Sequence, residues 1–560
     1  MTPARLETDV LVIGAGGAGL YAAIEAARQG QRVLLADRSL IGRGGATVMA
    51  MMTVAVALGE SGPDAPEHHL ADTLASGRGL SDPSLAAALC EDGPACIREM
   101  DEWGVGWARE NGAIAAAHAP GHDRPRCVYV DFLNTGPAVS KTLRKAAHKQ
   151  DTVRRVGDLL IVDLVRDRDG AVRGAVGVDI ASGRAVAIAA KATVIATGGL
   201  TRLYRRSSAS VNMGGDGYAL ALRAGAPLID MEFVQFFPIG HLAPRLIGLD
   251  PIMWDPFRYK LGGRLLNGEM QEFTERYGAP EGGKYVITRD AATYAILKEN
   301  AAGRGSPHGG AYLSFEHVGG DKLRQAFGPV IEKLAKNGID LTRRPVEVAP
   351  IAHYHMGGVA AAADMSTRVP GLFVAGEAVG GANGANRLSG NAITEAFVFG
   401  RRAGASAARH ATAVTGAATL PPAAGAVLDL VAADNCATGE NPAALIVELQ
   451  ALMSDKVGPF RDAAGLNEAL AAIATLEARL GAAPPGRPGA FDPMRVDWFD
   501  LRNMILVARV VTEAALGRTE SRGAHQRNDY PGLDEAWTLN QFASLAATGD
   551  IDIRAQAPAP

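Results

Sequence analysis

One short stretch near the start of the chain limits the fold more than any other. The run VLVIG, residues 10–14, is apolar without alternation, which is typical of a buried parallel strand. The next residues, AGGAG, place Gly14, Gly16 and Gly19 in the spacing G-x-G-x-x-G. A segment of helical composition, LYAAIEAARQG, follows and ends in a glycine. The sequence therefore predicts a strand, a tight glycine turn and a helix.

A second strand follows this helix and ends in an acid. It reads QRVLLAD, with Asp37 as its last residue. In such a unit the first glycine allows the turn, the second lets backbone N–H groups reach a pyrophosphate, and the third lets the helix pack closely. Asp37 would accept hydrogen bonds from a ribose. The order of these parts predicts a dinucleotide-binding domain.

Two further apolar strands end in small residues. One is KATVIATGG, residues 191–199, and the other is GLFVAGE, residues 371–377. Three such strand ends, far apart in sequence, indicate one long cofactor that is contacted at several places. This favours FAD over NAD, and Glu377 could meet the sugar chain of the flavin.

Composition excludes several classes of protein. A chain of 560 residues is long for one hydrophobic core, so we expect more than one domain. The net charge of −4 gives no basic surplus for nucleic acid. The four cysteines (Cys90, Cys96, Cys127 and Cys436) form no C-x-x-C pair, so we expect no metal or iron–sulfur site. The start lacks a signal peptide, and the longest apolar run is too short for a transmembrane segment, so the protein is predicted to be cytoplasmic.

Several longer motifs carry a family resemblance. They read GAGGAG, ATGG, MGGDGYALALRAG, HYHMGG, GLFVAGE, GANRLSGN and RTESRGAHQRNDYP, in this order along the chain. The chain thereby resembles the flavoprotein subunits of succinate dehydrogenase and fumarate reductase, a superfamily that includes L-aspartate oxidase and the α subunit of adenylylsulfate reductase.

The resemblance implies an α/β architecture with four segments. A Rossmann-like FAD-binding domain over residues 1–236 is interrupted by a small α+β capping domain over 237–350. The FAD-binding domain resumes over 351–415, and a mostly helical C-terminal domain covers 416–560. The helical periodicity of LNEALAAIATLEARL and DLRNMILVARVVTEAALG agrees with the last assignment.

The resemblance also implies a set of FAD-binding residues. Beyond the first glycines and Asp37, they are Gly44, Gly45, Ala46, Thr197, Gly198, Asp216, Glu377, Ser389 and Asn391. Carboxylates suit ribose and ribityl hydroxyls because an ionised carboxylate only accepts hydrogen bonds. Succinate dehydrogenases carry a histidine bonded to the flavin soon after the second strand. This chain reads SLIGRGGATVMAMM there, without a histidine, so the FAD is expected to be non-covalent.

Three positions match residues that handle the substrate in the family. Arg387, in GANRLSGN, corresponds to the arginine that holds the substrate carboxylate, and a planar guanidinium can do so with two parallel hydrogen bonds. The alternative is a surface arginine on a loop. His353 matches a carboxylate-binding histidine. Arg289 falls where the family carries its proton-transferring arginine, although it could instead be a helix residue paired with Asp290.

Two departures from the family bear on the substrate. Phe237, in QFFPIG, replaces a histidine that touches the dicarboxylate, and His241 lies four residues further on. The stretch MWDPFRYKLGG brings Arg258 where the dicarboxylate enzymes have a threonine, glycines and acids, and it resembles adenylylsulfate reductase. Either the substrate is larger, flatter or more anionic than succinate, with Arg258 near it, or this loop has drifted and packs with its own aromatic residues.

The resemblance implies an FAD-dependent oxidoreductase. It would move a hydride between flavin N5 and a small anionic substrate, a carboxylate or enoate. An adenylylsulfate-reductase-like chain and an L-aspartate-oxidase-like enzyme remain alternatives. A flavin electron-transfer subunit without its own substrate is a further one, although it would not need the three residues Arg289, His353 and Arg387. The sequence leaves open whether electrons are exchanged with an iron–sulfur protein or another electron-transfer protein, with a quinol-linked chain, with free flavin or with oxygen.

Overall fold

The structure is a computed structural model that falls into two compact units. It describes residues 2–51, 53–119, 121–131, 134–246, 252–254, 261–277, 289–327, 329–435 and 440–559. The first unit comprises Met1–Arg205, Ser210–Phe233 and His355–Pro560. The second unit comprises Arg206–Ala209 and Val234–Tyr354. The first unit therefore contains the glycine-rich strand ends, and the second is an insertion in it.

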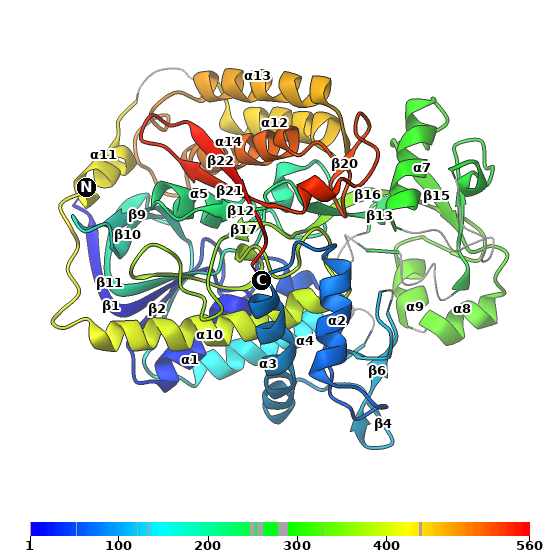
Figure 1. The fold of residues 1–560 in the computed structure, drawn as a ribbon, viewed down its shortest axis with the longest axis horizontal. Helices are drawn as coiled ribbons and strands as arrows, with labels where there is room; N and C mark the ends of the chain where they lie inside the picture. Colours follow the sequence, from blue (N-terminus) through cyan, green and yellow to red (C-terminus); the bar gives the residue numbers. More distant parts are fainter. Residues whose placement is uncertain are drawn as a thin grey trace. The chain divides into compact units, whose positions relative to one another are not determined.

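A seven-stranded sheet forms the centre of the first unit (Figure 1). Its strands, in spatial order, are β8 (Val153–Val156), β2 (Val33–Ala36), β1 (Ala4–Ile13), β11 (Arg184–Ile195), β10 (Val172–Asp179) and β9 (Leu159–Arg166), and β18 (Leu372–Val374) pairs with β11. Strands β8, β2, β1, β11 and β18 run parallel, whereas β10 is antiparallel to both β11 and β9. The predicted α/β fold is present.

The register of this sheet brings the three predicted strand ends together. Ile13 at the end of β1 lies beside Ile195 at the end of β11, and Ile195 lies beside Val374 at the end of β18. Carboxyl ends of parallel strands meet at one edge of a sheet, which is where ligands bind in open α/β folds. The glycines and Glu377 that follow these strands are therefore collected at that edge.

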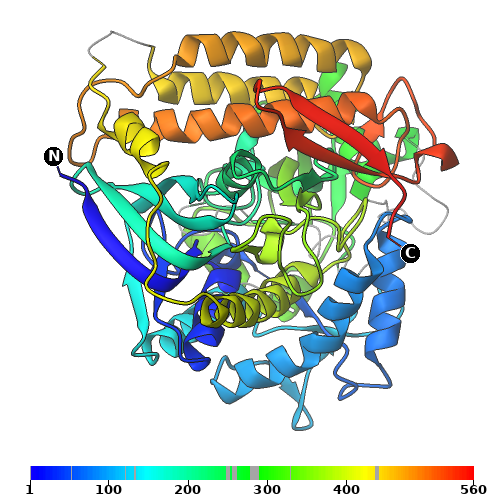
Figure 2. The same cartoon turned by 60° about the vertical axis from the view of Figure 1, so that its left-hand side comes forward.

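Two long helices pack against each other beside the sheet. They are α1 (Gly17–Arg28) and α10 (Asn391–Ala413), which cross one end of the first unit in Figures 1 and 2. A Cβ atom on Gly400 would lie 2.5 Å from the Ala18 carbonyl oxygen, and one on Gly404 would lie 2.4 Å from that of Ala22. The two backbones are thus close because glycines stand at the crossing, and this fixes the start of α10 near the glycine turn.

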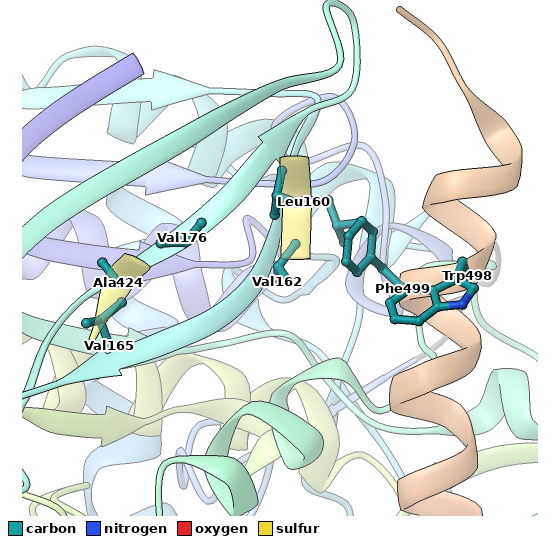
Figure 3. Packing of buried hydrophobic residues seen from close by; sticks show 8 residues of the cluster. Leu160, Val162, Val165, Val176, Ala424, Trp498 and Phe499 are labelled. Atoms are coloured by element: carbon teal, nitrogen blue, oxygen red, sulfur yellow. The ribbon is translucent and has the colours of Figure 1, made fainter. Parts of the chain in front are cut away.

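Three helices lie side by side in the C-terminal part, in line with the predicted helical domain (Figure 2). They are α12 (Pro442–Lys456), α13 (Ala463–Leu480) and α14 (Pro493–Gly517), with the shorter α11 (Ala424–Ala432) before them. Figure 3 shows how they join the sheet: Trp498 and Phe499 of α14 form a buried cluster with Leu160 and Val162 of β9. The burial of these large apolar side chains ties the helices to the cofactor-binding sheet.

The rest of the first unit consists of short elements. The helices are α2 (Pro66–Ser76), α3 (Pro83–Glu102), α4 (Thr135–His148) and α5 (Asp216–Arg223). One sheet runs in the order β17 (Gly358–Val359), β12 (Leu228–Ile229), β21 (Asn540–Leu545) and β22 (Ile551–Gln556). Small pairings involve β3 (Val54–Ala55), β4 (Arg109–Glu110), β5 (Ala113–Ile114), β6 (Ala116–Ala117), β7 (Cys127–Val128), β19 (Phe460–Arg461) and β20 (Gln526–Arg527). The C-terminal part thus ends in a β-hairpin.

The second unit is a small α+β body. Its sheet runs in the order β13 (Val234–Ala243), β16 (Val346–His355), β15 (Ala311–Ser314) and β14 (Arg264–Leu266). Its helices are α7 (Arg289–Ala301), α8 (Gly320–Phe327) and α9 (Pro329–Lys336). Strands β13 and β16 carry Phe237 and His353, so the sheet holds these two predicted residues side by side.

Candidate functional site

The first glycine turn is built around two contacts that exclude a side chain. Gly14 has φ +100°, and a Cβ atom on it would lie 2.4 Å from the carbonyl oxygen of Ala196. A Cβ atom on Gly19 would lie 1.8 Å from the carbonyl oxygen of Gly14. Both positions require glycine because β1, β11 and α1 meet there. Close packing within the protein therefore explains Gly14 and Gly19, whether or not a ligand is bound.

Two other predicted glycines have open space beside them. A Cβ atom on Gly16 would have only the Thr47 hydroxyl oxygen nearby, at 3.8 Å, and one on Gly45 would meet nothing within 4 Å. Gly45 has φ +80°, and its N–H donates to the Ser210 hydroxyl at 2.8 Å. Packing explains the tight glycines, whereas Gly16 leaves backbone accessible to a large ligand at the N-terminus of α1. This is the arrangement that a pyrophosphate needs.

The neighbouring predicted residues Gly44 and Ala46 are placed by protein contacts. A Cβ atom on Gly44 would lie 2.5 Å from the amide nitrogen of Asn212. Ala46 precedes a short 3₁₀ turn, Thr47–Met49. The stretch therefore lies against the loop that contains Ser210 and Asn212.

Asp37 accepts three hydrogen bonds from the protein. Its Oδ2 accepts from the Ala15 N–H at 2.7 Å, and its Oδ1 accepts from the Ser39 N–H and hydroxyl, each at 2.8 Å. Its half-buried carboxylate thus fixes the glycine turn to the loop after β2. A carboxylate has about four lone-pair sites, so capacity for a ribose hydroxyl remains.

Thr197 and Glu377 lie at the ends of the paired strands β11 and β18. The Thr197 hydroxyl is buried and has no hydrogen-bond partner among the residues that the structure describes. Glu377 is half-buried, and its Oε1 accepts from the His355 N–H at 3.1 Å. Burial, reinforced by Glu395 and opposed by Arg387, raises the pKa of Glu377 to about 8. A ligand that brings hydroxyl groups would satisfy both side chains, and the FAD ribityl chain is of this kind.

Gly198, which lies between these groups, has φ +76°. A Cβ atom there would lie 2.7 Å from the thioether sulfur of Met213. The orphaned Thr197 hydroxyl, the open glycines and the acid at the strand end together fit an FAD at this edge of the sheet.

Asp216 lies in a buried ion cluster. Arg38 donates to its Oδ2 at 3.1 Å, and the Asn503 amide donates to its Oδ1 at 3.2 Å. Arg38 also binds Asp500 of α14. The structure thus gives Asp216 protein partners, and its predicted contact with FAD stays a prediction.

Arg387 is buried, with 5% of its surface exposed. This contradicts the alternative of a surface arginine. Its Nη1 donates to the Leu388 carbonyl at 3.1 Å, and helix α10 begins four residues later at Asn391. The positive end of the helix dipole and the guanidinium therefore lie close together, which makes this loop favourable for an anion.

The two other predicted residues of this loop are held by histidines. The Ser389 carbonyl oxygen lies 2.7 Å from Nε2 of His122, and the Asn391 Oδ1 lies 2.8 Å from Nε2 of His69. Sequence reasoning gave neither histidine a role. The charged run HDRPR, which begins at His122, is the one feature of the sequence that could have pointed to this histidine; nothing in the sequence marks His69.

His353 lies on β16 of the second unit and contacts two side chains. Its Nδ1 is 2.8 Å from the Ser208 hydroxyl. Its ring packs edge-on against Phe237, with ring centroids 4.3 Å apart and planes at 75°. Phe237 is thus a direct neighbour of the predicted substrate histidine. An aromatic edge at this place gives apolar contact where a histidine would give a hydrogen bond.

His241 is held within the second unit. Its Nδ1 accepts from the Trp254 indole N–H at 3.0 Å, so its Nε2–H is the donor to the Pro244 carbonyl. Arg289 is the first residue of α7, and its side chain lies outside the described part of the structure. Arg258 lies outside the described residues altogether.

The described residues contain no group of three His, Cys, Asp or Glu side chains that could hold a metal ion. Within the same ranges, every helix is too short or too polar to cross a bilayer.

Comparison with known proteins gives two matching family models. The model described as "FAD binding domain" matches residues 9–393, and "Fumarate reductase flavoprotein C-term" matches residues 447–557. Together they cover the sheet, the second unit and the helices α12 to α14.

Relatives are similar along nearly the whole chain. A fumarate reductase (CoM/CoB) subunit of Methanothermobacter marburgensis is 34% identical, over 95% of this chain and 96% of that protein. The L-aspartate oxidase of Streptomyces coelicolor is 32% identical, over 95% of this chain and 90% of that protein. Among solved structures, Mycobacterium smegmatis Sdh1 in complex with UQ1 has a TM-score of 0.89 and 35% identity, covering 99% of this chain and 94% of that chain.

Proposed function

Because the chain belongs to the family of FAD-binding flavoprotein subunits of fumarate reductase and succinate dehydrogenase, we propose that it oxidises or reduces a small carboxylate or enoate. The predicted family, the α/β fold class and the FAD cofactor are confirmed by these matches. The protein is an FAD-dependent oxidoreductase. FAD, when bound, supplies the ring that takes up or releases a hydride.

The observation that carries the proposal is the buried Arg387 beside the start of α10. Burying a guanidinium costs free energy unless negative groups pair with it, and a substrate carboxylate can pair with a guanidinium through two parallel hydrogen bonds. Arg387 would hold and orient the substrate carboxylate. Glu377 would accept a hydrogen bond from the cofactor, with Thr197 as its neighbour.

His353 has a compatible role in the second unit. When the Ser208 hydroxyl donates to Nδ1, the neutral imidazole carries its hydrogen on Nε2 and can donate it to a carboxylate oxygen. Proton transfer by Arg289 and a substrate contact by Arg258 stay predictions from the sequence. A free guanidinium has a pKa above about 12, so Arg289 needs charged neighbours to act as a proton donor.

FAD is proposed to be held without a covalent bond, since the stretch after β2 contains no histidine. Release of the flavin by acid precipitation of the protein tests this. An electron-transfer protein, such as an iron–sulfur protein, is proposed as the partner. Its support is that the similar fumarate reductase protein is named as one subunit of an enzyme.

The activity is tested by reducing the bound flavin without oxygen, adding fumarate or but-2-enoate, and following the oxidised flavin absorbance. Reoxidation by either compound, abolished by Arg387→Met and retained by Arg368→Met at an exposed position of the same unit, is the expected result. Equal turnover in both variants would contradict the proposed role of Arg387 and favour the alternative of an electron-transfer subunit without its own substrate.

A further inference from the structure

The segment after His118 contacts the loop that carries Arg387. His122 is buried, with 6% of its surface exposed, and its Nε2 lies 2.7 Å from the Ser389 carbonyl oxygen. Ser389 is the second residue after Arg387. A carbonyl oxygen only accepts hydrogen bonds, so this contact requires a hydrogen on Nε2 of His122.

The neighbour on the other ring nitrogen fixes that tautomer. Nη1 of Arg126 lies 3.4 Å from Nδ1 of His122. Because a guanidinium has only donors, Nδ1 is the acceptor and carries no hydrogen. Arg126 is itself locked: its fully buried side chain donates to Asp64, Asp72 and Asp123. Three carboxylates therefore hold the arginine that orients His122.

A second buried histidine holds the far side of the same loop. Nε2 of His69, on α2, lies 2.8 Å from the Asn391 Oδ1. The Asn391 amide donates to the Thr73 hydroxyl at 3.2 Å, and that hydroxyl donates to the His69 carbonyl at 2.8 Å. The two imidazole rings are 6.3 Å apart. The loop between Arg387 and α10 is thus held from two directions.

Burial keeps both histidines neutral. It lowers the pKa of His69 to about 4, and it lowers the pKa of His122, with the charge of Arg126 acting in the same direction. A neutral imidazole with its hydrogen on Nε2 is the form that the hydrogen-bond pattern requires.

We propose that His122 is a positioning residue for the substrate, and that its Nε2–H sets Arg387 by holding the Ser389 carbonyl. The inference rests on the proposed role of Arg387. Peptide units are planar, so fixing the Ser389 carbonyl fixes the plane of the peptide that leads into α10. Loss of the donor would leave a buried carbonyl unsatisfied and free the loop to shift. A shift of roughly 1 Å in a substrate-holding group can cost on the order of 100-fold in rate.

The test compares three substitutions of one residue. His122→Gln keeps a donor at about the reach of Nε2, whereas His122→Leu has none and the shorter His122→Asn falls short of the carbonyl. His148→Leu, at an exposed position of α4, is the control. Each purified holoprotein is titrated with fumarate while the absorbance change of its oxidised flavin is followed, and KM and kcat for fumarate are measured with reduced methyl viologen.

The expected result is a dissociation constant and KM for fumarate at least about tenfold higher in His122→Leu and His122→Asn. His122→Gln and His148→Leu should stay within about threefold of the wild type, and flavin content should be equal in all. Equal losses in the Gln and Leu variants, or none in either, contradict the proposal. If His122→Leu fails to fold, a normal fumarate affinity in His122→Asn contradicts it. A wild-type protein that binds neither fumarate nor but-2-enoate contradicts the proposed function itself, and the inference falls with it.

Discussion

Arg38 and Asp500 form a two-bond ion pair between positions 462 residues apart in the sequence. Nη1 and Nη2 of Arg38 donate to Oδ1 and Oδ2 of Asp500 at 2.6 and 2.7 Å. Burial opposes both charges, but the pair holds the pKa of Arg38 above and that of Asp500 below its ordinary value. Arg38 follows Asp37, so helix α14 is bonded directly to the loop that the cofactor is expected to contact.

Asp500→Asn is expected to lower the free energy of unfolding by about 3 kcal/mol, because it removes one of the two carboxylates that pair with the buried Arg38, and breaking a buried ion pair is strongly destabilising. Arg202 would also lose its ion pair with Asp500 and keep the longer one with Asp497. Urea unfolding followed by tryptophan fluorescence measures the change. The matched control is Asp455→Asn, whose 3.0 Å ion pair with Arg205 is half exposed and is expected to contribute less than about 1 kcal/mol. Equal effects of the two substitutions would contradict the prediction.

The glycines of the first turn are expected to separate into two kinds. Gly19→Ala should prevent folding of the first unit, because its Cβ would lie 1.8 Å from the Gly14 carbonyl oxygen. Gly16→Ala should fold with an unchanged melting temperature, since its Cβ meets only ordinary contact at 3.8 Å. If FAD phosphates approach Gly16, however, the dissociation constant for FAD should rise at least about tenfold. Circular dichroism and flavin fluorescence measure both quantities. An unchanged dissociation constant for FAD in Gly16→Ala would mean that the pyrophosphate does not approach Gly16.

Glu377 is expected to make the FAD-free protein less stable as the pH rises. Its pKa is about 8 in the folded state against an ordinary value of 4.5, so the folded state binds the proton more tightly than the unfolded state. The stabilisation is therefore complete below pH 4.5 and is lost as the pH rises towards 8, by at most about 1.4 kcal/mol per pH unit. Urea unfolding of the apoprotein across this range should show the slope. Glu377→Gln should remove it, and Glu477→Gln, at an exposed position of α13, should keep it.

Phe237 is expected to weaken discrimination in favour of dicarboxylates. Phe237→His places a donor beside His353, where the ring centroids are now 4.3 Å apart. A hydrogen bond to a charged group contributes roughly 1.5–3 kcal/mol. The ratio of kcat/KM for fumarate over but-2-enoate should therefore rise about tenfold. Phe236→His, on the next position of the same strand, points to the other face and serves as the control. A similar rise of this ratio in Phe236→His would mean that the effect does not come from the contact between residue 237 and His353.

The sequence predicted the strands β1, β2, β11 and β18 of the central sheet because they are continuous apolar runs, and small residues or an acid follow each of them; β8, β9 and β10 were not predicted. The spacing assigned Gly14 to the turn and Gly19 to close packing of the helix, and the contacts at these two positions agree with those roles, whereas the approach of a pyrophosphate to Gly16 stays a prediction. The family motifs led to Arg387, and only the structure gives its burial.

Contacts between distant segments were beyond reach of the sequence. The side-chain partner of Arg38 lies in a helix that is recognisable only as amphipathic, and nothing in its pattern selects Asp500 over Asp497. The hydrogen bond from His122 to the Ser389 carbonyl could not be predicted either, because every residue has a backbone carbonyl and the residue types do not show which one is bound. The final hairpin β21–β22 was not predicted, because residues 416–560 were assigned as mostly helical; β21 pairs with β22 and also with β12, far earlier in the chain.

The pairing of β11 with β18 has a consequence for biosynthesis. Strands β1, β2 and β11 leave the ribosome first, but β18 follows only after the whole second unit has been made. Arg38 gains its partner later still, because Asp500 lies near the end of the chain. A nascent chain thus has the glycine turn before it has β18, the loop that carries Arg387 and helix α14, which complete the cofactor site. We therefore expect the complete FAD site to form only after α14 has been made, and the sheet edge that receives β18 to be open until that strand has been made.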